Sequence, residues 1–167
     1  KTRAFVDALP QGSTTRIADT RKTTPGLRAL ERYAVRCGGG HNHRDDLSSA
    51  VLIKDNHIAA AGGVRIAIER ARAHAPHTSR IECEVDRMEQ LREAIDARAD
   101  VVLLDNFDDA ALGEAVRFVA GRALLEVSGG VTLERIPVIA ATGIDVISAG
   151  GLTHSARAVD FALDWES

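Results

Sequence analysis

A set of polar and basic side chains lies in the first third of the chain, close to the ends of short apolar runs. Its members are Thr20, Arg21, Lys22, His43, Arg44 and Lys54. Guanidinium groups match carboxylates and phosphates with two donors at once, and an ammonium group supplies a compact positive charge. This set therefore predicts a site for a small polyanion. The open alternative is a set of surface ion pairs with three nearby acids, Asp19, Asp45 and Asp55.

Carboxylates follow the apolar runs in the middle of the chain. Glu84 and Asp105 lie at the ends of two such runs. A carboxylate there is costly to bury unless a metal ion, a hydroxyl group or a cation satisfies it. We therefore expect both to be functional and to hold a divalent cation. Glu82 lies two residues before Glu84 on the same strand face, and we expect it to be deeper and to pair with Lys22 or Lys54.

Two glycine loops follow the last two apolar runs. They contain Ser128, Gly129 and Gly130, and then Ala149, Gly150 and Gly151. Backbone N–H groups in such loops, leading toward a helix, suit a phosphate group. The alternative is a pair of simple tight turns, but the repetition on neighbouring strands favours the phosphate site.

Six apolar runs must position these residues, and we expect each to be a strand. They are Ile17–Asp19, Val51–Ile53, Ile81–Val85, Val101–Leu104, Ala123–Val127 and Ile144–Ser148. The gaps between them carry helical periodicity, and alternating strands and helices produce a parallel sheet. Apolar and acidic residues alternate over 81–86, which favours a barrel over a doubly wound sheet because a barrel directs the acids toward its mouth. We therefore predict an α/β fold, an incomplete parallel α/β barrel of six or seven strands.

Several helix boundaries can also be predicted. Residues 1–9 are expected to be helical, and Thr24 followed by Pro25 is typical of a helix start. The face of that second helix contains Leu27, Leu30, Ala34 and Cys37, and Gly38–Gly40 should end it. Pro137 predicts a helix that starts late or bends.

Composition excludes several classes of protein. The chain has 167 residues and a formal charge of -3, so it offers no basic field for nucleic acid. No apolar run approaches the roughly 20 residues that span a bilayer, so we expect no membrane partner and a cytoplasmic location. Cys37 and Cys83 lie in apolar runs without a paired motif and are expected to be reduced core thiols.

Longer motifs in the same order resemble those of the quinolinate phosphoribosyltransferase family. The first half carries Asp19–Arg28, Tyr33–Val35, Cys37–Gly40, Asn42–Arg44 and Leu52–His57. The second half carries Glu82–Val85, Leu103–Asn106, Glu126–Gly130, Gly143–Ser148 and Leu152–Ser155. A related molybdenum-associated family shares the early Thr-Arg-Lys block, but the Lys-Asp-Asn-His sequence that begins at Lys54 favours the quinolinate family.

The resemblance implies a reaction, a metal ion and a role for each residue. Quinolinate and phosphoribosyl pyrophosphate would give nicotinate mononucleotide, pyrophosphate and carbon dioxide in NAD biosynthesis, with Mg²⁺ as cofactor. The basic set would hold the dicarboxylate and part of the pyrophosphate, and the glycine loops would hold the 5'-phosphate. Lys54, Glu84 and Asp105 would be the catalytic residues, the last two also binding the metal ion.

The resemblance also implies an assembly and marks two departures. Family members are dimers or larger homo-oligomers, and they carry an N-terminal sandwich domain that we expect this chain to lack. We divide the chain into an N-terminal helix and connection (1–15) and a catalytic barrel (16–167). Asp45 and Asp46 replace an aliphatic residue and glycine, and should weaken dianion binding or clamp Arg44. The alternatives are a truncated barrel that only binds phosphate or dicarboxylates, and a different phosphoribosyl-type pyrophosphorylase.

Overall fold

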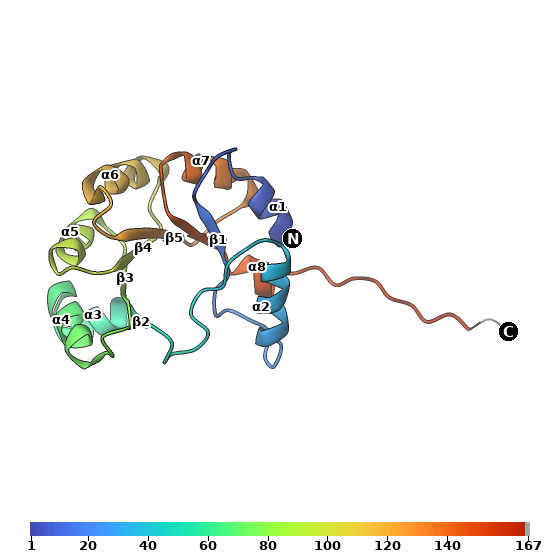
Figure 1. Ribbon diagram of the computed structural model, residues 1–167, viewed down its shortest axis with the longest axis horizontal. Coiled ribbons are helices and arrows are strands. Elements are labelled where there is room, and N and C mark those ends of the chain that lie inside the picture. The colour runs from blue at the N-terminus through green and yellow to red at the C-terminus, as the bar shows by residue number, and fades with distance from the viewer. Residues whose placement is uncertain (166–167) are drawn as a thin grey trace.

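A parallel sheet of six strands curves into an open barrel in the computed structural model, which describes residues 1–165 (Figure 1). The strands are β1 (Arg16–Ala18), β2 (Val51–Ile53), β3 (Ile81–Val85), β4 (Val101–Asp105), β5 (Leu124–Ser128) and β6 (Val146–Ser148). Their order across the sheet is β1-β6-β5-β4-β3-β2. Within the described residues β1 and β2 do not pair with each other, so the ring of strands has a seam. One isolated parallel bridge, Ala18 with His41, extends the sheet into that seam.

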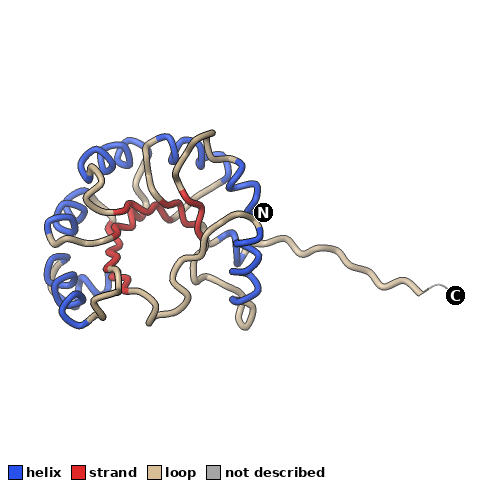
Figure 2. Tube along the Cα trace, in the orientation of Figure 1, coloured by secondary structure: helices blue, strands red, loops and turns tan. Residues whose placement is uncertain are grey.

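Helices surround the outside of this sheet (Figure 2). They are α1 (Thr2–Asp7), α2 (Arg28–Cys37), α3 (Asp55–Ala61), α4 (Val64–His74), α5 (Met88–Asp96), α6 (Asp109–Val119), the 3-10 helix η1 (Leu133–Arg135), α7 (Ile136–Ala141) and α8 (Gly151–His154). The strand order and the outer helices confirm the predicted incomplete α/β barrel.

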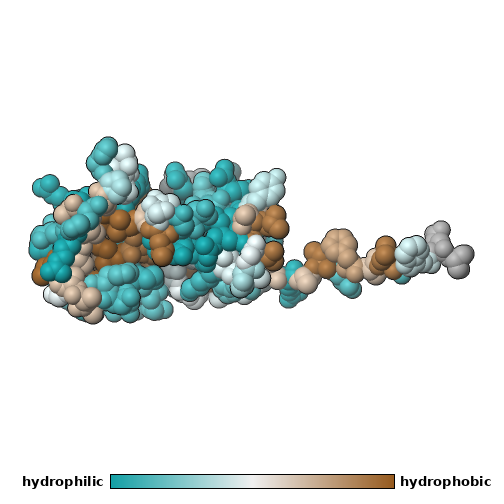
Figure 3. Space-filling model, turned by 90° about the horizontal axis from the view of Figure 1, so that it is seen from below, coloured by the Kyte–Doolittle hydropathy of each residue, from teal (hydrophilic) through white to brown (hydrophobic). Residues whose placement is uncertain are grey.

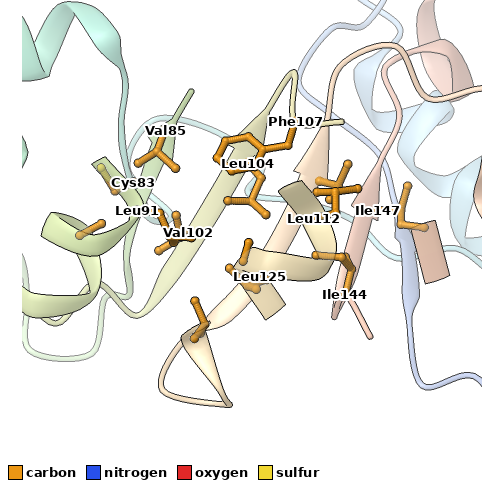
Figure 4. Close-up of a cluster of buried hydrophobic side chains, with 14 of the residues drawn as sticks. Cys83, Val85, Leu91, Val102, Leu104, Phe107, Leu112, Leu125, Ile144 and Ile147 are labelled. Carbon is orange, nitrogen blue, oxygen red and sulfur yellow. The ribbon is translucent and has the colours of Figure 1, made fainter. Parts of the chain in front are cut away.

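Alternating side chains divide each strand between the core and the barrel interior. Cys83 and Val85 of β3 point outward and pack with Leu91 of α5 in the buried cluster shown in Figure 4. Glu82 and Glu84 occupy the other face of the same strand, because successive side chains alternate across a strand. This alternation predicted the barrel correctly, since acids on an interior face can reach the barrel mouth.

Three predictions about the second helix and the cysteines are wrong. The helix begins at Arg28 and not after Thr24, because residues 24–27 form a turn in which Leu27 N–H donates to the Thr24 carbonyl at 3.0 Å. The predicted apolar face is not buried, since Leu30 is 67% exposed. Cys37 is exposed, whereas Cys83 is buried and both thiols are free as expected.

Other boundaries agree with the sequence. Gly38 caps α2, and α1 confirms the N-terminal helix. Pro137 lies in the first turn of α7, which starts after η1. A proline is tolerated at that position because the first N–H groups of a helix have no partner within it.

The last described residues extend away from the barrel (Figure 1). Val159, Phe161, Leu163 and Trp165 are exposed there, and Figure 3 shows apolar side chains along this segment. Residues 166–167 of the predicted catalytic barrel lie outside the described residues. No helix in residues 1–165 is long and apolar enough to cross a bilayer.

Candidate active site

A cavity of about 760 Å³ lies at the carboxyl ends of the strands. Every residue predicted for the site lines it: Thr20, Arg21, Lys22, His43, Arg44, Lys54, Glu84, Asp105, Ser128, Gly129, Gly130, Ala149, Gly150 and Gly151. These residues come from the ends of all six strands and from the loop in the seam, so the fold gathers groups that are far apart in sequence. Working sites of α/β barrels are built at this face.

Arg21 and Arg44 face this cavity without a carboxylate partner. Within residues 1–165 neither guanidinium group forms an ion pair, and the Nε atom of each is buried with no hydrogen-bond partner. Burial lowers the pKa of Arg44, and the nearby charge of Arg21 lowers it further. Two like charges held together in this way favour the binding of an anion.

The alternative of ordinary surface ion pairs is therefore wrong for these arginines. Asp19 and Asp45 instead lie 3.4 Å and 3.1 Å from nitrogens of Arg32 on α2. Asp46 does not clamp Arg44 either, since its Oδ1 accepts the backbone N–H groups of Ser48 and Ser49, each at 2.8 Å. The predicted clamp is thus absent from residues 1–165, because Arg32 and a local turn occupy both acids.

Arg32 also braces the loop that carries His43 and Arg44. Its Nη2 donates to the carbonyl of His43 at 2.9 Å. Asp19, with no exposed surface, accepts the backbone N–H of His43 at 2.7 Å. Sequence reasoning missed Arg32, because it is one of several charged residues on a predicted helix and has no motif of its own.

Lys54, which directly follows β2, forms an ion pair with Glu84 of β3. Asp105 ends the neighbouring strand β4, where Leu103 is in register with Glu84. Burial raises the pKa of Asp105, the negative charge of Glu84 raises it further, and the charge of Lys54 opposes both. A second cation placed here would therefore relieve the repulsion between the two carboxylates.

This donor set fits the predicted magnesium ion. Mg²⁺ prefers oxygen ligands and takes one or two protein carboxylates, with water and substrate phosphates completing its shell. Glu84 and Asp105 supply two such carboxylates at the mouth of the cavity. A set of three or more protein ligands is not required for an ion held partly by phosphates.

The first glycine loop leaves backbone donors free. Gly129 and Gly130 have φ of 85° and 56°, a region that favours glycine. A Cβ on Gly129 would lie 2.9 Å from Oδ1 of Asp105. Within residues 1–165 the N–H groups of Gly129, Gly130 and Gly150 donate no hydrogen bond, so the loops can offer them to a phosphate.

His43 lines the cavity and contacts two buried glutamates. Its Nε2 is 3.3 Å from Oε2 of Glu82 on β3 and 3.5 Å from Oε1 of Glu126 on β5. The prediction that Glu82 pairs with Lys22 or Lys54 is wrong, because Glu82 pairs with His43. The reason is depth, since Glu82 is 6% exposed and lies below the level at which Lys54 meets Glu84.

The two carboxylates hold a proton in this group of three. The contacts of Nε2 with the carboxylates of Glu126 and then Glu82 raise the pKa of His43 to about 10, against the effect of burial. Burial also raises the pKa of Glu82. Nδ1 of His43 accepts the backbone N–H of Arg44 at 2.8 Å and so opposes protonation at Nδ1. The extra proton therefore lies on the side of Nε2 and the carboxylates.

Glu126, Ser148 and His154 also line the cavity, and sequence reasoning did not select them. Glu126 could have been found, since it lies two residues before Ser128 and so shares its strand face. His57 was missed as well. Its Nδ1 accepts the backbone N–H of Lys54 at 3.0 Å and fixes the start of α3 beside the catalytic candidate.

Comparison with known families identifies the chain. The model of the family "Quinolinate phosphoribosyl transferase, C-terminal domain" matches residues 1–164. The chain belongs to this family. Among curated relatives, the nicotinate-nucleotide pyrophosphorylase (carboxylating) of Mycobacterium leprae is 48% identical over 166 residues, which are 98% of this chain and 58% of that protein. The human enzyme of the same name is 43% identical over 155 residues, 91% of this chain and 52% of its own length.

Solved structures of similar proteins share the fold. NadC from Streptococcus pyogenes superposes with a TM-score of 0.91 at 44% identity, covering 98% of this chain and 57% of that one. The nicotinate-nucleotide pyrophosphorylase from Francisella tularensis gives a TM-score of 0.87 at 45% identity, covering 91% and 54%. The family-like barrel is therefore established, and the chain spans little more than half the length of these relatives.

Proposed function

We propose that this chain carries out carboxylating phosphoribosyl transfer to quinolinate. Quinolinate and phosphoribosyl pyrophosphate would give nicotinate mononucleotide, pyrophosphate and carbon dioxide, a step of NAD biosynthesis. The observation that carries the proposal is the pair Arg21 and Arg44. Their guanidinium groups have no carboxylate partner in the described chain, and they line one cavity together with Glu84 and Asp105. Family membership supports the same reaction.

The two arginines would bind the two carboxylates of quinolinate. Lys22 lines the same cavity and adds a positive charge for quinolinate or for pyrophosphate. His43 belongs to this group through the N–H of Arg44 that it holds. Such binding orients the pyridine nitrogen toward the ribose, and orientation of two reactants lowers the barrier without any covalent bond to the protein.

The carboxylates would stabilise charge on the ribose. The pyridine nitrogen attacks the anomeric carbon as the bond to pyrophosphate breaks, so positive charge develops on the sugar ring. Glu84 and Asp105 lie at the cavity mouth, where their negative charges can offset it. Lys54 forms an ion pair with Glu84 and so holds the carboxylate of Glu84 in place.

The remaining groups would hold the phosphates. Free N–H groups of Gly129, Gly130 and Gly150 suit the 5'-phosphate of the ribose. When Mg²⁺ is bound, it neutralises charge on the leaving pyrophosphate. Glu84 and Asp105 are the residues that would hold this ion.

Loss of carbon dioxide would follow from the first step. Once its nitrogen is bonded to ribose, the pyridinium ring attracts electrons. The bond to the 2-carboxylate can break so that its electron pair stays on the ring, and a proton then replaces the carboxylate. Arg21 and Arg44 have only to keep the ring in place during this step.

Release of labelled carbon dioxide tests the reaction. Quinolinate labelled at its 2-carboxylate is supplied with phosphoribosyl pyrophosphate and Mg²⁺, and each is omitted in turn. We expect release that requires both. Consumption of a different base with no release from quinolinate would support another pyrophosphorylase and contradict the proposal.

The share of the relatives' length that the chain spans keeps a second candidate open. A barrel that binds quinolinate or phosphate without turnover would show ligand binding and no carbon dioxide at any Mg²⁺ concentration. The same assay with the chain joined to the N-terminal half of a relative separates an insufficient chain from an inactive site. A cytoplasmic location and a homodimer or larger assembly belong to the main proposal, and sedimentation would test the latter.

A further inference from the structure

Two buried carboxylates that contact His43, one of them lining the cavity, have no role in the reaction proposed above. Glu82 and Glu126 are 6% and 4% exposed. Each has one oxygen atom, Oε1, without a hydrogen-bond partner in the described residues. Burying a carboxylate costs free energy unless a partner compensates it. The partner that both share is Nε2 of His43.

His43 connects these carboxylates to the backbone of the loop that binds anions. Nε2 faces Glu82 and Glu126 at 3.3 Å and 3.5 Å, and Nδ1 accepts the N–H of Arg44 at 2.8 Å. Both ring nitrogens are therefore engaged inside the protein. The imidazole is fixed from two opposite sides, which leaves it little freedom to turn toward a ligand.

Arg44 needs such support because its own side chain is weakly held. Nη1 donates to the carbonyl of Ala50 at 3.0 Å, while Nε has no partner in the described chain. The charge of Arg21 lies close enough to lower the pKa of Arg44. Repulsion between the two guanidinium groups would push them apart if the backbone at Arg44 could move.

We propose that His43 is a positioning residue. Glu82 and Glu126 fix the orientation of its ring, the ring fixes the backbone of Arg44, and His43 thus acts on the substrate through Arg44. The two carboxylates, His43 and the backbone of Arg44 are then one connected polar unit, joined by the ion-pair contacts of Nε2 and the hydrogen bond to Nδ1. The effect on quinolinate rests on the proposed function, whereas the effect on the Arg44 amide does not.

Nuclear magnetic resonance tests the second effect directly. In protein labelled with ¹⁵N we expect a scalar coupling across the hydrogen bond between the Arg44 amide nitrogen and Nδ1 of His43. The Nδ1 chemical shift should be that of an unprotonated nitrogen near pH 7. A protonated Nδ1, or an Arg44 amide that exchanges with solvent as fast as an exposed one, would overturn the proposal.

A double-mutant cycle tests the transmission to substrate. The affinity for quinolinate is measured by calorimetry in the wild type, Glu126→Leu, His43→Ala and the double variant. We expect Glu126→Leu to weaken binding about fivefold, which is about 1 kcal/mol, and to have less than about a twofold effect once His43 is alanine. Independent, multiplicative effects would mean that Glu126 does not act through His43.

Two further variants guard against a general loss of structure. Glu126→Gln keeps an oxygen that can accept the Nε2 proton, so it should retain the coupling and bind quinolinate within about twofold of the wild type. Glu114→Leu removes an exposed acid that pairs with Arg92 and should change neither measurement. If the wild type shows the coupling but binds no quinolinate, the proposed function fails and the positioning role stands.

Discussion

The barrel floor, formed by His43, Glu82 and Glu126, and the cavity mouth at Arg21 and Arg44 differ in whether the protein itself supplies a partner of opposite charge. On the floor, Glu82 and Glu126 are buried and meet His43 within 3.5 Å. At the mouth, Arg21 lies close enough for its charge to lower the pKa of Arg44, and neither guanidinium group forms an ion pair with an acid within residues 1–165. Charges that the protein satisfies itself contribute to stability, and charges that it leaves unpaired are available to a ligand. Substitutions on the floor should therefore reduce the free energy of unfolding, whereas substitutions at the mouth should reduce the affinity for the ligand.

The largest effect should come from the floor. His43→Ala leaves two buried carboxylates without their common partner, and removal of one member of a buried ion pair costs about 3 kcal/mol. Urea unfolding followed by circular dichroism measures this loss. A loss below about 1 kcal/mol would show that His43, Glu82 and Glu126 do not form a stabilising unit.

The next effect should appear at the mouth, in binding. Arg21→Ala removes a guanidinium group that has no internal ion pair, so its free energy of unfolding should change by less than about 1 kcal/mol. Its affinity for quinolinate should fall about 100-fold, as for loss of one partner in a buried charge pair. Calorimetry gives the affinity, with Arg92→Ala as a control on an exposed arginine. Wild-type affinity in Arg21→Ala would contradict the assignment.

A pH series should sharpen the contrast. An unfolded histidine loses its proton near pH 6.5, whereas Glu126 and Glu82 raise the pKa of His43 in the folded protein to about 10. The folded group of His43, Glu82 and Glu126 therefore keeps one extra proton between Nε2 and the carboxylates, while Nδ1 stays unprotonated. The folded state thus binds more protons between these values, and stability falls as pH rises through them. This stabilisation is complete below about pH 6.5. We expect a smaller fall in His43→Gln than in the wild type, measured by urea unfolding from pH 6 to 10. If stability falls equally with pH in the two proteins, the group of His43, Glu82 and Glu126 holds no extra proton in the folded state.

The smallest effect should come from substitution of the exposed acid Asp45. Asp45 is exposed and pairs with Arg32, which stays bound to Asp19 and the His43 carbonyl. Exposed ion pairs contribute about 0 to 1 kcal/mol, so Asp45→Ala should change stability by less than that. Quinolinate affinity should stay within about threefold of wild type in a calorimetric titration. A larger gain would show that Asp45 opposes the dianion.

The sequence predicted the mouth better than the floor. Side chains at strand ends, such as Lys54, Glu84 and Asp105, can be found from apolar runs alone, because the carboxyl ends of parallel strands meet at one face. The partner of Glu82 could not, since a period of two shows that it points inward and says nothing about what enters from a loop. The exposed Leu30 is a second example, because periodicity predicts which residues share a helix face but not whether another element packs on that face.

The seam between β1 and β2 has a mechanical consequence. Ala18 and His41 form its single bridge in the described chain, and the residues that follow His41 are those that face the anion site. The backbone that would complete the ring of strands is thus the same backbone that presents Arg44. A dianion that draws this loop inward also tightens the barrel wall, so ligand occupancy and closure of the ring are thermodynamically linked. The N–H groups of Asp19 and His41 donate to the carbonyls of His41 and Ile17 across this bridge, so amide exchange at Asp19 and His41 should slow when the cavity is filled.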